Sequence, residues 1–404
     1  MQQALSHLAQ DVASAKEQGR YRTYLNLERR AETAPRAVLH AADGPREITV
    51  WCSNDYLSLS HHPTVADAVA DAVRGVGLGT GGARSISGTS TFHEDLEAEL
   101  ASLYRKERAL LFSTGFAAND ATLSVLGRRI PGLVIFSDEL NHASIIQGIR
   151  NSGAQKRIFR HNDTGHLRKL LEETDPDAPK LVAFESLYSM EGDFSPVREI
   201  VDIAEESGAL TYLDEIHSVG IYGEEGSGYA EQQGVRDRIT VFQGGFGKGL
   251  GGAGGYIAGP ASVIDSVRTF AAPFVFSTSA PAPLVAGALS ALRLVRHDST
   301  QRDLLRARAA ELKEGLAARG IPVISRDSHV VPVLVGDPHR NKQVSALLLG
   351  DHGIYVQPVN APTVPEGTER LRVTPTSRHT AEDVQTFVEA LDAVWSAAGL
   401  PRGR

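Results

Sequence analysis

Short apolar segments alternate with helical patterns between residues 108 and 258, and this alternation restricts the possible fold more than any other feature. Each segment reads as a short buried strand bounded by polar or glycine-rich turns. Strands joined through helices pack as a mainly parallel sheet with helices on both faces. The sequence therefore predicts an α/β domain with a seven-stranded sheet, whose strands lie at residues 109–112, 133–136, 157–159, 180–184, 209–213, 239–242 and 255–258.

The rest of the chain divides around this region. Helical periodicity marks residues 62–75 and 93–107, with a glycine-rich loop over 75–82 between them. A long helix is expected from about residue 290 to 318, followed by strands and a closing helix from about 380, which indicates a second, smaller α/β domain. We expect an N-terminal helical segment over 1–47, a large domain over 48–289 and a small C-terminal domain over 290–404.

Composition excludes several classes of function. The chain has 404 residues, of which 42% are hydrophobic and 22% charged, as is usual for a soluble globular protein. The net charge of −8 and the lack of a basic stripe argue against nucleic acid and acidic membranes as partners, and no apolar run approaches a membrane span of about 20 residues. A single cysteine, Cys52, excludes an internal disulfide and a cysteine-based zinc site. We predict a cytoplasmic protein without a metal site.

The segment Gln243–Gly255 packs eight glycines around one lysine, Lys248, between two expected strands. A phosphate-binding loop of the GxxxxGK[ST] type would need a glycine at Phe242 and a hydroxyl at Gly249, so that motif fails. The letters of the dinucleotide motif GxGxxG are present, but Tyr256–Ala258 follows at once and leaves no room for the required helix. We therefore expect a glycine-lined turn that holds one amine close to other backbone.

Polar residues follow several of the expected strands, where ligands bind in parallel α/β sheets. Ser113–Asn119 leads into a helix, and small residues with free amides at a helix start suit a phosphate. Ser137–His142, Glu185–Met190 and Asp214–His217 follow three further strands, and Lys248 follows a fourth. A phosphate cradle, histidines, carboxylates and a lysine are therefore expected at one edge of the sheet.

These residues resemble those of the α-oxoamine synthases, a family of fold-type I pyridoxal-phosphate (PLP) enzymes that condense an amino acid with an acyl-CoA. The resemblance extends over nearly the whole chain and is strongest to the branch that condenses glycine with succinyl-CoA to give 5-aminolevulinate. The segments that carry it are Gly19–Arg22, Trp51–Leu57, Phe136–Ser144, Gly148–Gly153, Phe159–Asp163, Phe184–Asp193, Gly353–Pro358 and Pro362–Arg372.

The resemblance implies catalytic roles for four residues. Lys248 would bind the cofactor aldehyde and then, as a free amine, remove a proton from glycine. Asp214 would pair with the protonated pyridine nitrogen, and His217 would contact the ring hydroxyl. His142 would stack on the ring, since imidazole offers a flat face and a proton donor.

Further roles follow from the same resemblance. The cofactor would also be bound by Thr114, Gly115, Phe116, Glu185 and Ser189, and by Ser277 and Thr278 donated from the partner subunit of a homodimer. Asn54 and Arg372 would hold the glycine carboxylate, because guanidinium geometry matches a carboxylate, and Arg22 would bind the far carboxylate of succinyl-CoA. The remaining substrate residues would be Ala83, Ser85 and Ser137.

Three positions depart from the pattern of this branch. Ala83 and Ser85 stand where threonine and asparagine are usual near the succinyl carboxylate, and Gly245 stands where a threonine commonly contacts the phosphate. Another α-oxoamine synthase with a different acyl-CoA or amino acid is therefore the nearest alternative. An aminotransferase and a non-catalytic descendant are more distant ones, and the intact Lys248, Asp214 and His217 count against the latter.

Overall fold

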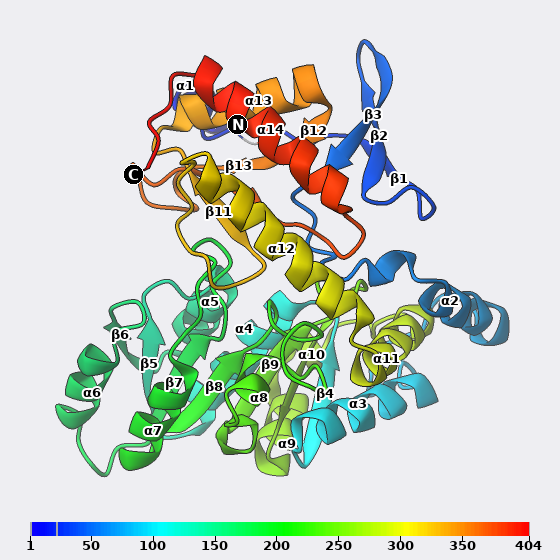
Figure 1. Cartoon of the computed structure of the whole chain (residues 1–404). Coiled ribbons are helices and arrows are strands. Elements are labelled where there is room, and N and C mark those ends of the chain that lie inside the picture. Colours follow the sequence, from blue (N-terminus) through cyan, green and yellow to red (C-terminus); the bar gives the residue numbers. More distant parts are fainter. Residues whose placement is uncertain (1, 22, 404) are drawn as a thin grey trace. The chain divides into compact units, whose positions relative to one another are not determined.

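The computed structural model describes residues 2–21 and 23–403 and forms two compact units (Figure 1). The large unit comprises Asn54–Tyr188 and Phe194–Arg302. The small unit comprises Met1–Ser53, Ser189–Asp193 and Asp303–Arg404.

The large unit contains the predicted seven-stranded sheet, in the order β4-β10-β9-β8-β7-β5-β6. Strand β10 is antiparallel to both β4 and β9, and the other neighbours pair in parallel, so the prediction of a mainly parallel sheet is confirmed. The strands are β4 (Arg108–Phe112), β5 (Val134–Asp138), β6 (Gln155–Phe159), β7 (Lys180–Glu185), β8 (Leu210–Asp214), β9 (Val241–Gly245) and β10 (Gly255–Gly259).

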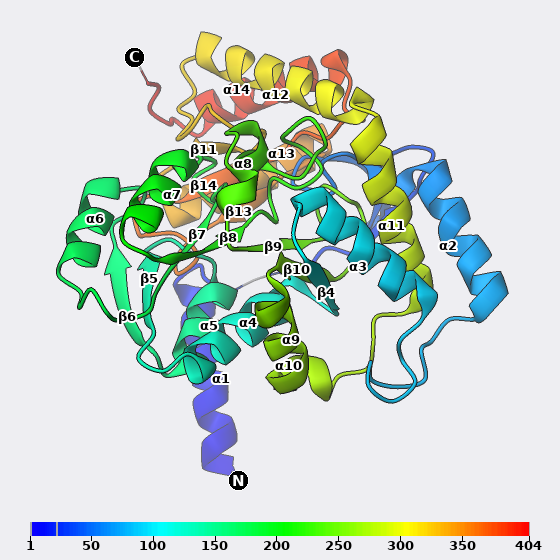
Figure 2. The same ribbon diagram turned by 90° about the horizontal axis from the view of Figure 1, so that it is seen from below.

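Helices cover both faces of this sheet, as Figure 2 shows, with α4, α5, α9 and α10 on one face and α3, α7 and α8 on the other. The strands are buried on both faces because alternate side chains point into the two helical layers. The helices of the large unit are η1 (Leu59–His61), α2 (Pro63–Val76), α3 (Thr91–Tyr104), α4 (Gly115–Arg129), α5 (Ala143–Ser152), α6 (Thr164–Glu172), α7 (Val197–Glu206), α8 (Tyr229–Gln232), η2 (Arg236–Arg238), α9 (Ala261–Phe270), α10 (Ala272–Val275) and α11 (Ala282–His297).

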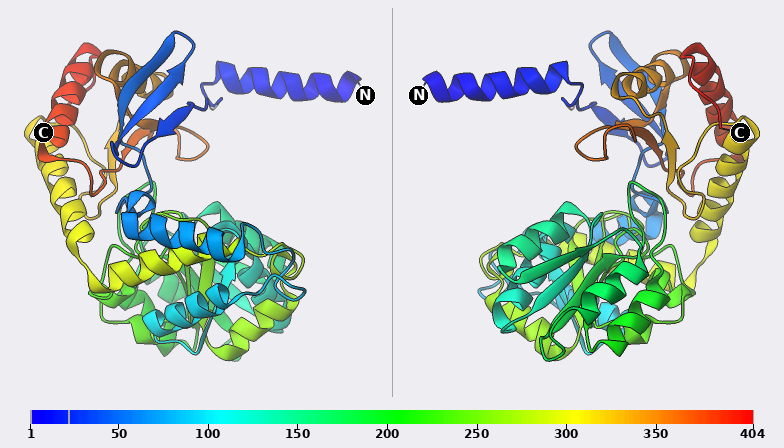
Figure 3. Two further views of the ribbon diagram at one scale, coloured as in Figure 1. Left: turned by 90° about the vertical axis from the view of Figure 1, so that its right-hand side faces the viewer. Right: turned by 90° about the vertical axis from the view of Figure 1, so that its left-hand side faces the viewer.

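The small unit has two sheets and its own apolar core. One sheet has the order β1-β2-β3-β12 and the other β11-β14-β13. The core gathers Trp51, Phe387 and Trp395 with surrounding aliphatic side chains. Its elements are α1 (Gln2–Glu17), β1 (Leu27–Arg29), β2 (Arg36–Ala41), β3 (Gly44–Val50), α12 (Thr300–Ala318), β11 (Val331–Leu334), α13 (Pro338–His352), β12 (Ile354–Tyr355), β13 (Gln357–Val359), β14 (Arg370–Val373) and α14 (Ala381–Ala397). Figure 3 shows α1 extending away from the strands of this unit.

The observed units differ from the expected domains in where the large unit begins and ends: it runs from Asn54 to Arg302, whereas 48–289 was expected. Residues 1–53 belong with the C-terminal part because β12 pairs in parallel with β3, and three strands follow α1 where only helix was expected. The single long helix expected over 290–318 is two helices, α11 and α12. The break lies at residues 298–299, and the carboxylate of Asp298 accepts a hydrogen bond at 2.8 Å from the amide of Thr300, the first residue of the second helix.

A buried histidine lies in the core of the small unit. His379 is 3% exposed, and its ring centroid lies 4.0 Å from that of Trp51. Its Nδ1 accepts a hydrogen bond from the Thr376 amide at 2.9 Å. Burial lowers the pKa of His379 to about 4, so the imidazole is neutral in the folded protein at neutral pH.

This burial predicts a stability loss in mild acid. Between pH 6.5 and about 4 the unfolded chain binds a proton at His379 that the folded chain does not, so the free energy of unfolding falls as pH falls. The loss should reach about 2 kcal/mol at pH 5, since one pKa unit corresponds to about 1.4 kcal/mol. Denaturant unfolding at pH 7 and pH 5 measures it. His379→Gln should be less stable at pH 7 but lose less on acidification, and equal losses in both proteins would contradict the assignment.

Candidate active site

Four side chains of the large unit form a chain of hydrogen bonds that ends at the lysine of the glycine turn. The Nζ of Lys248 lies 2.5 Å from Nε2 of His217. The Nδ1 of His217 lies 2.9 Å from the hydroxyl of Tyr56, and that hydroxyl donates to Oδ1 of Asn54 at 3.1 Å. The structure thus brings together Lys248 and His217, which lie 31 positions apart in the sequence.

The turn that carries Lys248 depends on close backbone approach. Residues 246–254, all of which the structure describes, contain no helix, so the dinucleotide motif is excluded as predicted. A methyl group placed on Gly249 would overlap the carbonyl oxygen of Val219, and one on Gly251 would overlap the amide nitrogen of Ser60. Gly251 also has φ of +64°, a conformation that other residues rarely adopt. Glycine is therefore required here both for backbone conformation and for space.

Asp214, at the end of β8, is a buried carboxylate held by neutral donors. Its Oδ2 accepts a hydrogen bond from Nδ2 of Asn119 at 2.9 Å, and its Oδ1 accepts one from the Ile216 amide at 2.9 Å. Tyr212 orients Asn119 by donating to its Oδ1 at 2.7 Å. Burial raises the pKa of Asp214, although these hydrogen bonds and the charge of Lys248 oppose the effect. A protonated ring nitrogen of a bound cofactor would supply the partner that such a carboxylate needs.

His142 and Glu185 lie beside this group. The His142 amide donates to Oε1 of Glu185 at 2.6 Å, and Nδ1 of His142 lies 2.7 Å from the hydroxyl of Ser144. Burial raises the pKa of Glu185 well above its usual range, and the nearby Asp214 raises it further. Burial lowers the pKa of His142, the charge of Asp214 opposes that shift, and the charge of Lys248 adds to it. A neutral imidazole with a flat face is therefore available at the start of α5.

The expected phosphate cradle is the start of α4. Thr114 caps this helix, since its hydroxyl accepts a hydrogen bond from the Ala117 amide at 3.0 Å. The first amides of a helix have no partner within it and carry a partial positive charge, so they suit an anion. Gly115 and Phe116 supply two of these amides, and the side chains of Thr114 and Phe116 are exposed.

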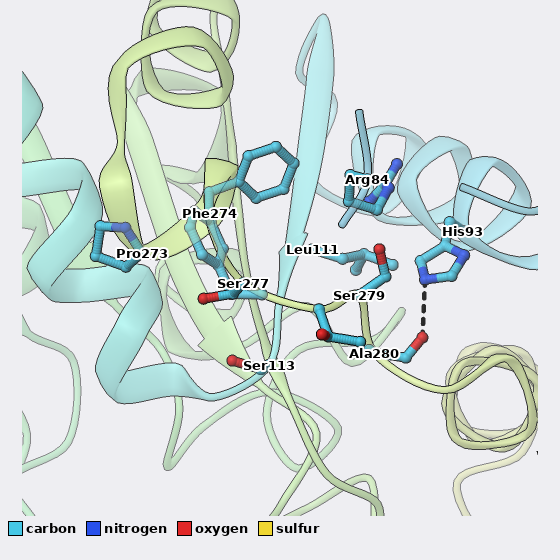
Figure 4. Close-up of a pocket in the computed structure, with 11 residues that line it drawn as sticks. Arg84, His93, Leu111, Ser113, Pro273, Phe274, Ser277, Ser279 and Ala280 are labelled. Atoms are coloured by element: carbon cyan, nitrogen blue, oxygen red, sulfur yellow. Dashed lines mark hydrogen bonds between the residues drawn. The ribbon is translucent and has the colours of Figure 1, made fainter. Parts of the chain in front are cut away.

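Ser277 and Thr278, which we expect to be donated to the partner subunit, lie in residues 276–280, a segment that we call the strap. The strap runs beside the loop of residues 77–90 that contains Ala83. Ala83 and Thr278 form an antiparallel bridge, and the Ser279 amide donates to the Gly82 carbonyl at 3.0 Å. Figure 4 shows the pocket of about 20 Å³ between them, with Nε2 of His93 lying 3.0 Å from the Ala280 carbonyl oxygen. The predicted acyl-binding and phosphate-binding segments are therefore physically joined.

An ion pair fixes the same loop to α3. The guanidinium of Arg84 donates to both carboxylate oxygens of Glu97, at 2.7 and 3.0 Å, and both side chains are largely buried. Glu97 also accepts a hydrogen bond from the Leu111 amide at 2.9 Å. The neighbour Ser85 is exposed, while Ala83 is half-buried. A bidentate pair with little solvent access holds the loop in one position.

The other predicted residues are distributed over both units. The hydroxyl of Ser137 accepts from Asn141 at 2.9 Å and is 5% exposed, so its own partners already engage it. In the small unit, Nε of Arg372 donates to the carbonyl of Ser189 at 2.8 Å. Asn54 belongs to the large unit, so its expected pairing with Arg372 stays a prediction. Arg22 lies outside the described residues.

Two residues of the site had no role in the sequence analysis. Tyr56 contacts His217, and Asn119 contacts Asp214. Both lie inside segments that were singled out for other reasons, Trp51–Leu57 and Ser113–Asn119. Neither contact has a short-range signal, because each joins residues that are 161 and 95 positions apart, respectively.

In the part of the chain that the structure describes, no three His, Cys, Asp or Glu side chains are placed to hold a metal ion. Over the same residues, no helix is long and apolar enough to cross a membrane.

Comparison with known proteins identifies the group of enzymes that shares this arrangement. Residues 46–391 match the family described as aminotransferase class I and II. The chain is 50% identical to 5-aminolevulinate synthase of Rhodobacter capsulatus, covering 98% of both chains, and 50% identical to that of Paracoccus denitrificans, covering 98% of this chain and 97% of the relative. A solved variant of serine palmitoyltransferase from S. paucimobilis with bound PLP-myriocin is 30% identical, covers 98% of both chains and superposes with a TM-score of 0.90.

The match to the synthases is nearly complete in length, and the predicted fold agrees with it. The chain therefore belongs to the 5-aminolevulinate synthase family, within the class I and II aminotransferases.

Proposed function

We propose that the protein is a PLP-dependent 5-aminolevulinate synthase, which condenses glycine with succinyl-CoA and releases CoA and carbon dioxide. The observation that carries the proposal is the placement of Lys248 against His217 at the edge of the sheet where Asp214, His142 and Glu185 also lie. The identity to named 5-aminolevulinate synthases supports the choice of reaction. The single cysteine is an unpaired thiol, which suits the reducing cytoplasm.

The residues present fit the cofactor. Asp214 would hold the protonated ring nitrogen, His142 would cover the ring, and the amides at the start of α4 would bind the phosphate. When bound, PLP withdraws electrons from the amino-acid carbon and so stabilises the negative charge that proton removal or loss of carbon dioxide leaves there. The charge of Lys248 opposes the rise that burial causes in the pKa of Asp214 and Glu185 and adds to the fall in the pKa of His142, so all three groups lie within its electrostatic range.

Lys248 would act first as the attachment point for the cofactor aldehyde and then as the base that takes a proton from the α-carbon of glycine. His217 holds the Nζ of Lys248 by its Nε2, and Tyr56 fixes the orientation of the imidazole through Nδ1. The amine therefore has a defined position before the cofactor aldehyde is attached, which lowers the entropic cost of that attachment.

The resemblance assigns the glycine carboxylate to Asn54 and Arg372 and the far carboxylate of succinyl-CoA to Arg22, with Ser85 and Ser137 as further substrate residues. Ala83 brings no hydroxyl to the acyl-CoA, although its backbone is fixed against Thr278. This absence favours, as a second candidate, an α-oxoamine synthase of the same mechanism that takes another acyl-CoA.

We further propose that the active enzyme is a homodimer. Phe276 directly precedes Ser277 and is 85% exposed, and Leu78 and Ile86, in the loop segment before and after Ala83, are 73% and 81% exposed. Large exposed apolar side chains commonly mark a surface that another chain covers. A second copy is the natural partner, because it would bring Ser277 and Thr278 to the phosphate of its neighbour.

The assigned reaction predicts release of CoA from succinyl-CoA that depends on both glycine and PLP, with 5-aminolevulinate as the product. Thiol release, with the amino ketone identified by mass spectrometry, measures it, and alanine and other acyl-CoAs run alongside test substrate choice. Lys248→Ala should lower turnover by at least about a thousandfold while still binding PLP, because it removes both the attachment point and the base. Activity only with another acyl-CoA would move the assignment to the second candidate, and normal activity of Lys248→Ala would remove both.

Ala83→Thr should strengthen the use of succinyl-CoA. A hydroxyl that donates to a carboxylate contributes roughly 1.5–3 kcal/mol, which corresponds to a fall in KM for succinyl-CoA of about tenfold or more. Steady-state kinetics with each substrate varied in turn tests this, and KM for glycine should not change. Ala83→Val, which has the same shape without the hydroxyl, is the control. An equal effect of threonine and valine would show that no such hydrogen bond forms.

The dimer proposal predicts that Phe276→Asp weakens both self-association and cofactor binding, because a charge would be buried in the interface. Sedimentation velocity should show a shift from dimer to monomer at micromolar concentration, with loss of PLP absorbance from the protein. Ile158→Asp is the control, since Ile158 is 54% exposed on the edge strand β6, away from the strap. A monomeric wild-type protein with full activity would disprove shared sites.

A further inference from the structure

The side chain of Ile216 occupies the space next to two glycines of the expected phosphate site. Ile216 follows β8 and is half-buried. A methyl group placed on Gly245, at the end of β9, would lie 2.8 Å from Cδ1 and 3.0 Å from Cγ1 of Ile216. A methyl group on Gly115, at the start of α4, would also lie 2.8 Å from Cδ1. Carbon atoms in contact are normally about 3.5–4.0 Å apart, so a side chain at either position would require the side chain of Ile216 to move.

Backbone conformation does not explain these glycines. Neither Gly115 nor Gly245 has a positive φ, whereas Gly251 and Gly254 in the same region do. Gly245 lies in the regular pairing of β9 with β10, opposite Gly255. A residue with a side chain could therefore adopt the backbone angles at 245, and its Cβ would press on Cδ1 and Cγ1 of Ile216 and lie 3.3 Å from the Gly254 carbonyl oxygen.

Besides Ile216, the side chain of Gln243 and the backbone of β10 also pack closely against Gly115. A methyl group on it would lie 3.3 Å from Nε2 of Gln243, which is fully buried and donates to the Gly244 carbonyl at 2.8 Å. A methyl group on Gly255 would lie 2.5 Å from the Cα of Gly115. The start of α4 is thus fixed by Ile216, Gln243 and β10 together, and its amides cannot shift toward the sheet.

We infer that Ile216 is a positioning residue for the cofactor phosphate, and that Ile216 and Gly245 act as one unit. Ile216 supports the start of α4 at Gly115 and, with its side chain in the same position, fills space that a hydroxyl-bearing side chain at 245 would need. The phosphate is then held by Thr114, by the amides of Gly115 and Phe116 and by the hydroxyls of Ser277 and Thr278, without a ligand from β9. This inference rests on the proposed function, because it takes PLP as the ligand of the site.

The steric part is tested without cofactor. Gly245→Thr should lower the melting temperature of the apo protein by roughly 3 °C or more, because overpacking costs about 1–3 kcal/mol. In the Ile216→Val protein, which lacks Cδ1, Gly245→Thr should lower the melting temperature by clearly less. Gly252→Ala is the control, since its added methyl would meet nothing closer than 3.5 Å. Gly245→Ala serves if the threonine variant does not fold. The inference is overturned if Gly245→Thr does not lower the melting temperature, or lowers it equally in the wild-type and the Ile216→Val protein.

The phosphate part is tested by comparing PLP with pyridoxal, which lacks the phosphate. With Ile216→Val present, Gly245→Thr should raise the preference for PLP over pyridoxal about tenfold above that of Gly245→Val, because the two side chains differ only by the hydroxyl. Dissociation constants come from absorbance titration of the apo proteins. Equal preferences would show that position 245 does not face the phosphate. Wild-type protein that bound no PLP would remove the proposed function and the phosphate role, whereas the apo melting temperatures would still decide the steric role.

Discussion

The contact between Nζ of Lys248 and Nε2 of His217, at 2.5 Å, is the interaction on which the site depends. It requires a turn after β9 that comes within backbone contact of two other segments, at Val219 and at Ser60. Only glycine at 249 and 251 allows that approach, and Tyr56 then fixes the histidine from the other side. The glycine-rich segment is therefore a rigid, closely packed part of the fold, and not a flexible linker.

Buried charge defines the rest of the site. Asp214 and Glu185 are almost fully buried, and burial raises the pKa of both carboxyl groups. A fold does not normally retain such groups unless a partner compensates for their desolvation. Asn119 and backbone amides supply part of that compensation, and a cationic cofactor ring would supply more. The same polar groups that destabilise the apo site would thus make it selective for a ligand with a protonated ring nitrogen.

The loop expected to bind the acyl group and the strap expected to bind the phosphate are joined to each other and to α3. The loop with Ala83 and Ser85 is joined to the strap with Ser277 and Thr278 by backbone hydrogen bonds, and the Arg84–Glu97 pair and His93 anchor both to α3. A substitution in the acyl-binding loop can therefore displace residues expected at the phosphate. The departures from the usual residues at 83 and 85 lie in or beside these contacts, whereas Gly245 lies in β9 next to the side chain of Ile216.

The sequence by itself determined where the strands of the large sheet lie along the chain. Each buried strand of a parallel sheet is a short apolar run, which can be found without knowing which strands pair with it. The sequence also indicated the site residues that follow those strands, and motif resemblance supplied their expected roles. Only the tertiary structure decided which residues meet across long separations, such as Tyr56 with His217 and Asn119 with Asp214. It also decided that residues 1–53 join the C-terminal unit, since the pairing of β3 with β12 has no local signal. The shortage of space for a side chain at 245 is likewise a property of packing against Ile216, which no pattern of neighbouring residues can show.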